Sequence, residues 1–257
     1  MPRSPDELRE AVEAYLGVLP LAPDLGGLEE TLRYALESGG KRIRPVLCLA
    51  VSEAAGGRLE DALPAAAAVE LVHTFSLVHD DLPSMDDDSE RRGRPSAHVV
   101  YGEGVALLAG DALLTEAFRL ALSYDDPAIA RELIEATIGM IGGQHRDITG
   151  DDADLAELER LKTGRLFSAS VGLGLRAAGV PDGDQAPWRA FGDELGILFQ
   201  AIDDILDGDG FSKRLGISGA RRLADECAER ARERLAALPA DTSVLRELVD
   251  GLVVRAG

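Results

Sequence analysis

Five carboxylates lie within nine residues of the sequence, in the stretch DDLPSMDDD at positions 80–88. This stretch follows a mostly apolar segment, LVHTFSLVH, so Asp80, Asp81 and Asp86 come directly after a helix that we expect to be buried. Carboxylates that are close together and partly buried are unfavourable unless a positive charge neutralises them. The stretch is therefore either a solvated loop or half of a cation site.

A second acidic cluster occurs much later in the chain, in FQAIDDILD at positions 199–207. Positions i and i+4 of a helix share a face, so Asp203 and Asp207 point the same way and Asp204 lies one position round. Mg²⁺ takes oxygen ligands, usually one or two carboxylates together with substrate phosphates. A solvated polar face would explain either cluster alone, but two clusters that each close an apolar helix predict a split magnesium site for a phosphorylated ligand.

Three basic segments supply the positive charge that a polyanionic ligand also requires. The turn GGKRIRP places Lys41 and Arg44 at an expected helix start, where backbone N–H groups add affinity for anions. Arg91 and Arg92 follow the first acidic stretch, and Lys162 lies in KTGRLF. Arginine suits bidentate contact with phosphate. Each segment alone is an ordinary surface charge group, and RRGRP beside DDDSE also fits a local ion-pair loop, but the combination favours an anion site.

The elements that carry these residues are expected to be helices. The residues Ser4-Pro5-Asp6-Glu7 combine an N-cap, a first-turn proline and a glutamate three residues after the cap, which predicts a helix to Gly17. Breaks fall at glycine, proline and Asp-Asp clusters, and no stretch alternates as a strand does. We predict one all-α domain over residues 1–257, a bundle of about ten helices. The other expected helices are LEETLRYALES before Gly39, then 44–55, 60–81, 103–123, 127–147, 153–178, 186–207, 217–237 and 242–255.

The composition excludes some functions. Lys and Arg number 27 against 46 Asp and Glu, a formal net charge of −19, which argues against a nucleic-acid partner because such proteins carry a basic face. The N-terminus lacks the apolar core of a signal peptide, and no apolar run approaches the length of a membrane span. Cys48 and Cys227 form no zinc or CxxC pattern. We expect a cytoplasmic protein.

Taken together, these residues resemble the trans-isoprenyl diphosphate synthases, the polyprenyl synthase family that includes farnesyl and geranylgeranyl diphosphate synthases. The match runs in the family's order through GGKRIRP, ELVHTFSLVHDDLPSMDDDSERRGRPSAH, LLAGDALL, GGQHRDITG, KTGRLF and FQAIDDILD. DDLPSMD is similar to the longer form of the family's first aspartate-rich motif, and DDILD to the second. The resemblance implies the isoprenoid synthase fold, an all-α bundle around a deep central cavity, and a homodimer.

The resemblance also assigns roles to positions of this chain. The implied magnesium ligands come from both motifs: Asp80, Asp81, Asp86, Asp203 and Asp207. The implied catalytic group combines carboxylates with one lysine: Asp80, Asp81, Asp86, Lys162, Asp203 and Asp204. About three Mg²⁺ ions would be held once diphosphate is bound. The implied contacts to the allylic diphosphate are Arg91, Lys162, Thr163 and Gln200. The implied contacts to isopentenyl diphosphate are Lys41, Arg44, His73 and Arg92. Gln144 and Asp147 would line the cavity.

The chemistry that this family implies suits these residue types. Magnesium and cationic side chains stabilise a leaving diphosphate, so that the allylic C–O bond ionises. The double bond of isopentenyl diphosphate attacks the resulting carbocation, and the released diphosphate accepts the proton that leaves. An apolar cavity excludes the water that would quench the cation. His73 would otherwise be a core histidine, and Asp87 and Asp88 are expected to be solvated or paired with the following arginines.

Product length and one departure from the family are also visible in the sequence. Phe75 precedes Asp80 by five residues, about 7.5 Å along a helix axis, where the resemblance implies a floor under the growing chain. This favours farnesyl diphosphate, with geranylgeranyl diphosphate as the alternative, although Phe75 could also simply pack in the core. After DDILD the family usually has a longer loop with two lysines, and this chain has neither. Lys213 and Arg214 are the candidate substitutes, and a different lid or a partner subunit is the alternative.

Three other functions compete with this interpretation. A class I terpene cyclase would share the helical fold, but it would lack GGKRIRP and the second DDxxD motif and would carry an NSE-type triad. A non-catalytic subunit of a heteromeric prenyl synthase often loses aspartates from one motif, whereas both motifs are intact here. An acidic helical scaffold leaves the paired motifs unexplained. We therefore expect a Mg²⁺-dependent prenyltransferase.

Overall fold

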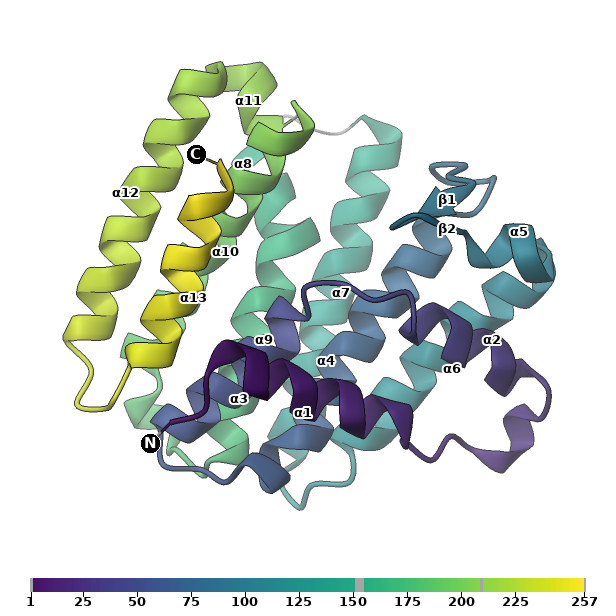
Figure 1. Cartoon of the computed structure of the whole chain (residues 1–257), viewed down its shortest axis with the longest axis horizontal. Helices are drawn as coiled ribbons and strands as arrows, with labels where there is room; N and C mark the ends of the chain where they lie inside the picture. The colour runs from purple at the N-terminus through teal and green to yellow at the C-terminus, as the bar shows by residue number, and fades with distance from the viewer. Residues whose placement is uncertain (1, 151–154, 209, 257) are drawn as a thin grey trace.

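The computed structural model of the chain describes residues 2–150, 155–208 and 210–256. Within these ranges nearly all regular structure is helical, which confirms the all-α prediction (Figure 1). The α-helices are α1 (Pro5–Gly17), α2 (Leu28–Leu36), α3 (Ile43–Ala54), α4 (Leu59–Asp80), α5 (Ala97–Tyr101), α6 (Glu103–Ala121), α7 (Pro127–Thr149), α8 (Leu155–Glu159), α9 (Arg165–Ala177), α10 (Ala186–Asp207), α11 (Gly210–Leu215), α12 (Ile217–Ala236) and α13 (Ser243–Val253).

Short irregular elements connect the helices. A π-helical turn, η2 (Arg160–Gly164), joins α8 to α9, and a small antiparallel hairpin pairs β1 (Glu90–Arg91) with β2 (Arg94–Pro95). The 3₁₀ turns are η1 (Pro23–Leu25), η3 (Asp182–Asp184) and η4 (Val254–Ala256). The sequence did not predict the hairpin, α5 or α11. Residues 153 and 154, where the predicted helix 153–178 begins, lie outside the described residues, and η2 interrupts the rest of that helix.

Local sequence signals account for several helix starts. At α1 the Ser4 hydroxyl accepts a hydrogen bond from the Glu7 backbone N–H, while the Glu7 carboxylate accepts one from the Ser4 backbone N–H at 2.8 Å. This is the capping box that the sequence predicts, and it satisfies two N–H groups that would otherwise lack partners. Helices α7 and α10 each begin with a proline in the first turn, where the missing N–H costs nothing.

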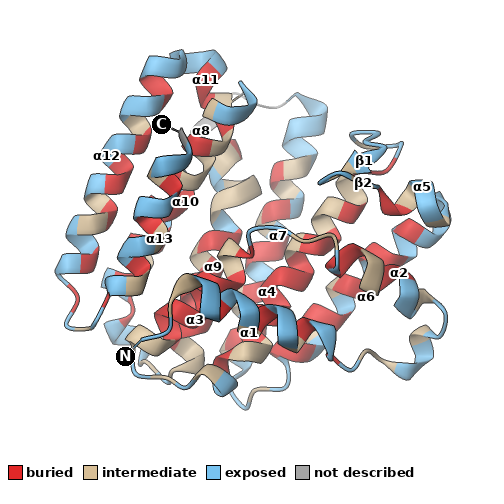
Figure 2. Ribbon diagram, viewed as in Figure 1, coloured by how far each residue is buried: buried red, intermediate tan, exposed pale blue. Residues whose placement is uncertain are grey.

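Helix α4 is the central element of the bundle, and it packs against α3, α6 and α9 (Figures 1 and 2). Its residues from Ala65 to Val72 are all buried, because the helix is apolar around its whole circumference. Among the described helices it alone is long and apolar enough to cross a membrane by length and composition, but 67% of its most apolar window is buried inside the fold. The first acidic motif therefore follows a helix whose central part is enclosed.

Candidate active site

The first acidic motif folds back on the end of α4. Asp81 caps the helix, and the chain then turns so that the Asp86 backbone N–H donates to the Asp80 carbonyl at 2.9 Å. A second bond joins the Asp87 N–H to the Leu82 carbonyl at 3.1 Å, with Asp87 in the left-handed region (φ 55°). This turn is the bulge that the extra residues of DDLPSMD imply, and it brings Asp86 back beside Asp80.

Asp81 turns away from these two aspartates. Its side chain is buried and accepts a hydrogen bond from Nε of Arg91 on β1 at 2.8 Å, reinforced by an Nη2 contact. Arg91 also donates to Asp88 at 2.9 Å, as the expected pairing of Asp88 with a following arginine implies. Neither Asp81 nor Arg91 lines the main cavity described below. The structure thus separates these two from Asp80 and joins them in an ion pair.

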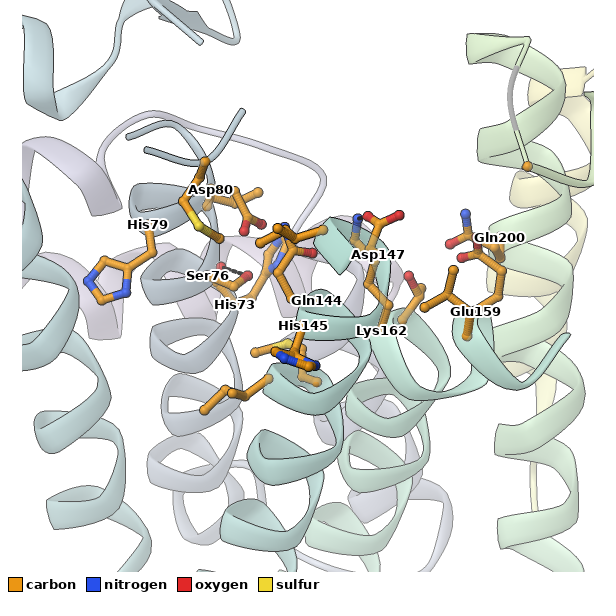
Figure 3. A pocket seen from close by; sticks show the side chains of 18 of the residues that line it. His73, Ser76, His79, Asp80, Gln144, His145, Asp147, Glu159, Lys162 and Gln200 are labelled. Carbon is orange, nitrogen blue, oxygen red and sulfur yellow. Dashed lines mark hydrogen bonds and ion pairs between the residues drawn. The ribbon is translucent and has the colours of Figure 1, made fainter. Parts of the chain in front are cut away.

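The main cavity has a volume of about 730 Å³ and is bordered by α4, α7, α8, η2 and α10 (Figure 3). Figure 3 shows Asp80 at the top of α4, with Asp147 and Lys162 on facing helices and Gln200 on α10. Apolar side chains form part of the lining, among them Phe75, Met140 and Leu158. The polar lining includes these residues singled out from the sequence: Arg44, His73, Asp80, Gln144, Asp147, Lys162, Thr163, Gln200, Asp203, Asp204 and Asp207.

A second cavity of about 550 Å³ adjoins the first, because several residues border both, His73 and Asp203 among them. It collects the basic residues of the GGKRIRP turn and of the hairpin. Its lining includes all four residues that were expected to hold isopentenyl diphosphate: Lys41, Arg44, His73 and Arg92. The residues expected to bind the allylic diphosphate and those expected to bind isopentenyl diphosphate therefore line two neighbouring cavities, and Arg91 is the exception.

Arg44 is held by aromatic rings. Its guanidinium lies 4.7 Å from the ring centroid of Phe167 and 5.4 Å from that of Phe199, and its Nη1 is 3.4 Å from Nε2 of His73. Nε of Arg44 is buried without a hydrogen-bond partner. Burial lowers the pKa of Arg44 to about 10, although Glu70 and Asp203 oppose the shift. A desolvated cation whose donors are incompletely used is suited to receive an anion.

Two buried residues that the sequence analysis left unassigned support this turn. Arg42 has a left-handed backbone (φ 46°) and donates from Nε to Glu13 at 2.7 Å and from Nη1 to Glu70 at 2.5 Å. Glu70 lies on α4 one turn before His73 and is almost fully buried. The sequence contains one sign of this pair. Glu70 is a lone carboxylate in the apolar run AAAAVELVHTF, and a buried carboxylate requires a cationic partner.

Lys162 is positioned by α7 and η2. Its ammonium contacts the carboxylate of Asp147. Desolvation alone would lower the pKa of Lys162, but the interaction with Asp147 outweighs it, so the pKa is raised overall. Asp80 and Asp86 add to this effect, which places all of these charges near one another. A Cβ at Gly143 would come within 2.7 Å of the Lys162 backbone nitrogen, so the glycine permits the close approach of the two backbones.

Phe75 lies where a floor was expected. It lines the main cavity and meets the His79 ring edge-on, with the ring centroids 5.0 Å apart and the planes at 76°. Nε2 of His79 is 3.0 Å from the Leu107 carbonyl of α6. A Cβ at Gly110 would overlap the His79 ring, so this glycine makes room for it. Phe75 thus borders the cavity beside His79, and His79 in turn contacts α6.

The acidic residues fit a divalent cation. Burial, together with the neighbouring Asp86 and Asp81, raises the pKa of Asp80 to about 6 against the opposing effects of Lys162 and Arg91. Burial and the neighbouring Asp207 also raise the pKa of Asp203. Within the described ranges, no three His, Cys, Asp or Glu side chains gather closely enough to hold a metal by themselves. Each motif could thus supply a few hard oxygen ligands, with phosphate oxygens as the others.

Asp204 differs from its neighbours on α10. It is buried, and its carboxylate accepts hydrogen bonds from Nε2 of Gln200 at 2.7 Å and from the backbone N–H of Phe211 at 2.6 Å. Lys213 and Arg214, the expected substitutes for the missing loop lysines, are both exposed, and neither lines the main cavity. The short segment after the second motif therefore contributes backbone groups to this end of the site, and the side chains of Lys213 and Arg214 do not line the main cavity.

An all-helical bundle with two acidic motifs and a basic compartment around one cavity defines a diphosphate-processing enzyme of the prenyl synthase class. The polyprenyl synthetase family model matches residues 26–220, and the chain therefore belongs to this family. It is accordingly an enzyme, a prenyltransferase. Members of the family use an allylic diphosphate and isopentenyl diphosphate as substrates, and Mg²⁺ to bind diphosphate.

Individual relatives agree with this assignment. The chain is 36% identical to the farnesyl diphosphate synthase of Bacillus subtilis (strain 168), over 96% of this chain and 95% of that one. It is 42% identical to the geranylgeranyl diphosphate synthase of Cyanophora paradoxa, over 77% of this chain and 71% of that one. The solved geranyltranstransferase of Thermotoga maritima superposes with a TM-score of 0.85 at 32% identity, covering 98% of both chains. The relatives thus include makers of both products.

Proposed function

We propose that this prenyltransferase condenses an allylic diphosphate with isopentenyl diphosphate to make farnesyl diphosphate. The observation that supports the product is the position of Phe75 in the wall of the main cavity, five residues before Asp80 on α4. An aromatic ring there limits the depth available to a growing chain. Geranylgeranyl diphosphate is the alternative product, and relatives of both kinds are known.

The main cavity is proposed to hold the allylic substrate. Lys162, Thr163 and Gln200 would contact its diphosphate, and the apolar lining would enclose its hydrocarbon chain. Arg91 is not proposed as a direct contact to the diphosphate, because its guanidinium is bound to Asp81. In this ion pair Asp81 fixes the hairpin beside the motif and is not proposed as a direct metal ligand.

The second cavity is proposed to hold isopentenyl diphosphate. Lys41, Arg44 and Arg92 would neutralise its diphosphate, and His73 lies at the border with the first cavity. The Arg42–Glu70 pair would keep the turn in place before substrate arrives. The shared border lets the double bond of one substrate approach the allylic carbon of the other, which is the geometry that an addition reaction needs.

Asp80 and Asp86 from the first motif, with Asp203 and Asp207 from the second, are the proposed holders of about three Mg²⁺ ions. When bound, these ions supply the positive charge that stabilises the departing diphosphate. Lys162 and Arg44 add fixed positive charge from the protein itself, and the apolar wall excludes water from the allylic carbon. No protein base is required, because the released diphosphate accepts the proton.

We further propose that residues 1–257 act as one domain in a cytoplasmic homodimer. Exposed apolar side chains on the neighbouring helices α6 and α7 support a partner of the same kind, since large apolar patches on a protein surface mark interaction sites. They are Val105, Leu107, Leu108, Ile134 and Ile138.

The direct test is to incubate the protein with isopentenyl diphosphate and each of dimethylallyl, geranyl and farnesyl diphosphate, with and without Mg²⁺. Farnesyl diphosphate should accumulate from the first two primers, only with Mg²⁺ present. Efficient extension of farnesyl diphosphate would replace the proposed product with the geranylgeranyl one. No turnover of any primer would favour a subunit that needs a partner. One relative, 46% identical over 76% of this chain and 58% of its own length, is named as large subunit 1 of a heterodimeric geranylgeranyl pyrophosphate synthase of Arabidopsis thaliana.

A further inference from the structure

The segment that follows the second acidic motif is short, and it borders the active site. Helix α10 ends at Asp207, α12 begins at Ile217, and α11 (Gly210–Leu215) lies between them (Figure 1). Gly210, at the start of α11, lines the main cavity, and Phe211 and Ser212 are buried. This segment therefore closes the cavity at the α10 end without the lysine-bearing loop expected for the family.

Among the described residues, hydrogen bonds join Asp204 to this turn and to Gln200. Its carboxylate accepts from the Phe211 backbone N–H at 2.6 Å, and its backbone carbonyl accepts from the Gly208 N–H at 3.0 Å. The other carboxylate oxygen accepts from Gln200 at 2.7 Å. The start of α11 is thus hydrogen-bonded to α10 through the Asp204 side chain.

The glycine at position 210 is an independent sign of the same arrangement. Gly210 has a left-handed backbone (φ 44°), and a Cβ built there would overlap the carboxylate of Asp204. Gly208 is also left-handed (φ 70°), but a Cβ there would meet nothing within 4 Å. Only Gly210 is therefore required by the presence of Asp204, and the pair provides matched test positions.

Asp204 also orients Gln200. A carboxylate only accepts hydrogen bonds, so the Gln200 amide must turn its NH₂ group toward Asp204. The amide then has one further N–H to donate, and Gln200 lines both cavities. Asp204 thus holds the start of α11 and also orients the Gln200 amide, which lines both cavities.

We propose that Asp204 is a positioning residue that holds α11 (Gly210–Leu215) as the lid of the allylic site and aligns Gln200, and that it does not ligate magnesium. This proposal rests on the proposed substrate placement. It differs from the role that the family resemblance gave to Asp204, a place in the catalytic group, whereas the resemblance did not count Asp204 among the magnesium ligands. The lid is then made by a helix of six residues, anchored from within the motif itself.

The test compares Asp204→Ala, Asp204→Asn, Gly210→Ala and, as the matched control, Gly208→Ala, with Asp203→Ala as the reference for loss of a metal ligand. The first readout is amide hydrogen exchange across residues 208–216 in Mg²⁺-free protein, which requires no activity. Asp204→Ala and Gly210→Ala should speed exchange there more than Gly208→Ala, which adds only the strain of an alanine in the left-handed region that it shares with Gly210→Ala. Asp204→Asn should keep exchange slow, because its amide oxygen still accepts the Phe211 N–H.

The second readout is steady-state kinetics over a Mg²⁺ titration. Asp204→Ala and Gly210→Ala should lower kcat/KM for the allylic substrate by roughly tenfold or more. Their half-saturating Mg²⁺ concentration should stay at the wild-type value, while that of Asp203→Ala should rise. Unchanged exchange in Asp204→Ala, or a rise in its Mg²⁺ requirement matching that of Asp203→Ala, would overturn the proposal. If the wild-type protein turned over no primer, the proposed function would fail. The exchange experiment would still show whether Asp204 holds α11 in place.

Discussion

The backbone N–H of Asp86 bonds to the backbone carbonyl of Asp80 across six positions of sequence, at 2.9 Å. On a continuous helix these two residues would not share a face, since six positions correspond to about 600° of rotation. The turn beyond α4 removes this difference by bringing the Asp86 backbone back to the end of α4, where Asp80 lines the main cavity and Asp86 is exposed. The longer form of the motif therefore reaches the same functional geometry by a hydrogen-bonded loop.

Loss of the first aspartate of either acidic motif should abolish turnover. Asp80→Ala and Asp203→Ala should each reduce kcat by at least about 100-fold, because charge stabilisation at a leaving group contributes on that scale. Circular dichroism and thermal unfolding should show an intact fold, since both carboxylates are destabilising in the folded protein at neutral pH. Asp87→Asn is the control and should retain wild-type activity, because Asp87 is exposed and asparagine tolerates its left-handed backbone. Activity retained in either alanine variant would contradict the split site.

Replacement of Phe75 should change the product. Phe75→Ala opens the wall of the cavity below Asp80, so the growing chain should lengthen by at least one isoprene unit. Phe75→Tyr keeps the ring and should keep the product length. Product sizing by chromatography after incubation with geranyl and isopentenyl diphosphate checks both variants. An unchanged product in the alanine variant would show that the floor lies elsewhere in the cavity.

Lys162 and Asp147 should differ in their kinetic effects although they form one ion pair. Lys162→Ala should raise KM for the allylic diphosphate by about 10- to 100-fold, the usual scale for a lost charge-assisted hydrogen bond. Asp147→Asn should not raise it, because the lysine stays in place and loses only a competing carboxylate. Initial rates at saturating isopentenyl diphosphate measure both values. Equal effects of the two variants would assign the role to the pair and not to the lysine.

His73 should make the stability of the protein depend on pH. Burial, reinforced by Arg44 and Arg92, lowers the pKa of His73 well below its usual value near 6.5. The unfolded chain then binds this proton more tightly, so the contribution to stability is complete above pH 6.5 and is lost as the pH falls below it. The loss is at most about 1.4 kcal/mol per pH unit.

Urea unfolding of wild type and His73→Gln between pH 5 and 7.5 isolates this effect, because all other titrating groups are common to both. The difference in unfolding free energy should change below pH 6.5 and be constant above it. A difference that does not vary with pH would mean that His73 has the same pKa in the folded and the unfolded protein.

The sequence predicted the features that depend on local pattern. The helices that carry Asp80 and Asp203 follow from apolar periodicity and caps, and the family order of the motifs placed them across one cavity. The partners of Asp81 and Asp204 were not predictable in this way. Both carboxylates look equivalent to their neighbours in sequence, and only the positions of Arg91 and Phe211 in space distinguish them.

Two further features were missed for physical reasons. Helix α11 has six residues, one turn of which begins at a left-handed glycine, so it carries too little periodicity to be recognised. The Arg42–Glu70 pair joins residues 28 positions apart, and charge complementarity at that distance is visible only once α3 and α4 are packed together. Tertiary contacts, not propensity, determined both.

Arg44 has a consequence for the end of the reaction cycle. Its guanidinium rests on two phenyl rings with a buried, unpartnered Nε, so the protein without substrate keeps a poorly satisfied cation in place. Any diphosphate relieves that cost, including the inorganic diphosphate that every turnover releases. On the proposed role of this residue, product inhibition by inorganic diphosphate is built into the enzyme, and removal of that ion by hydrolysis would sustain the rate.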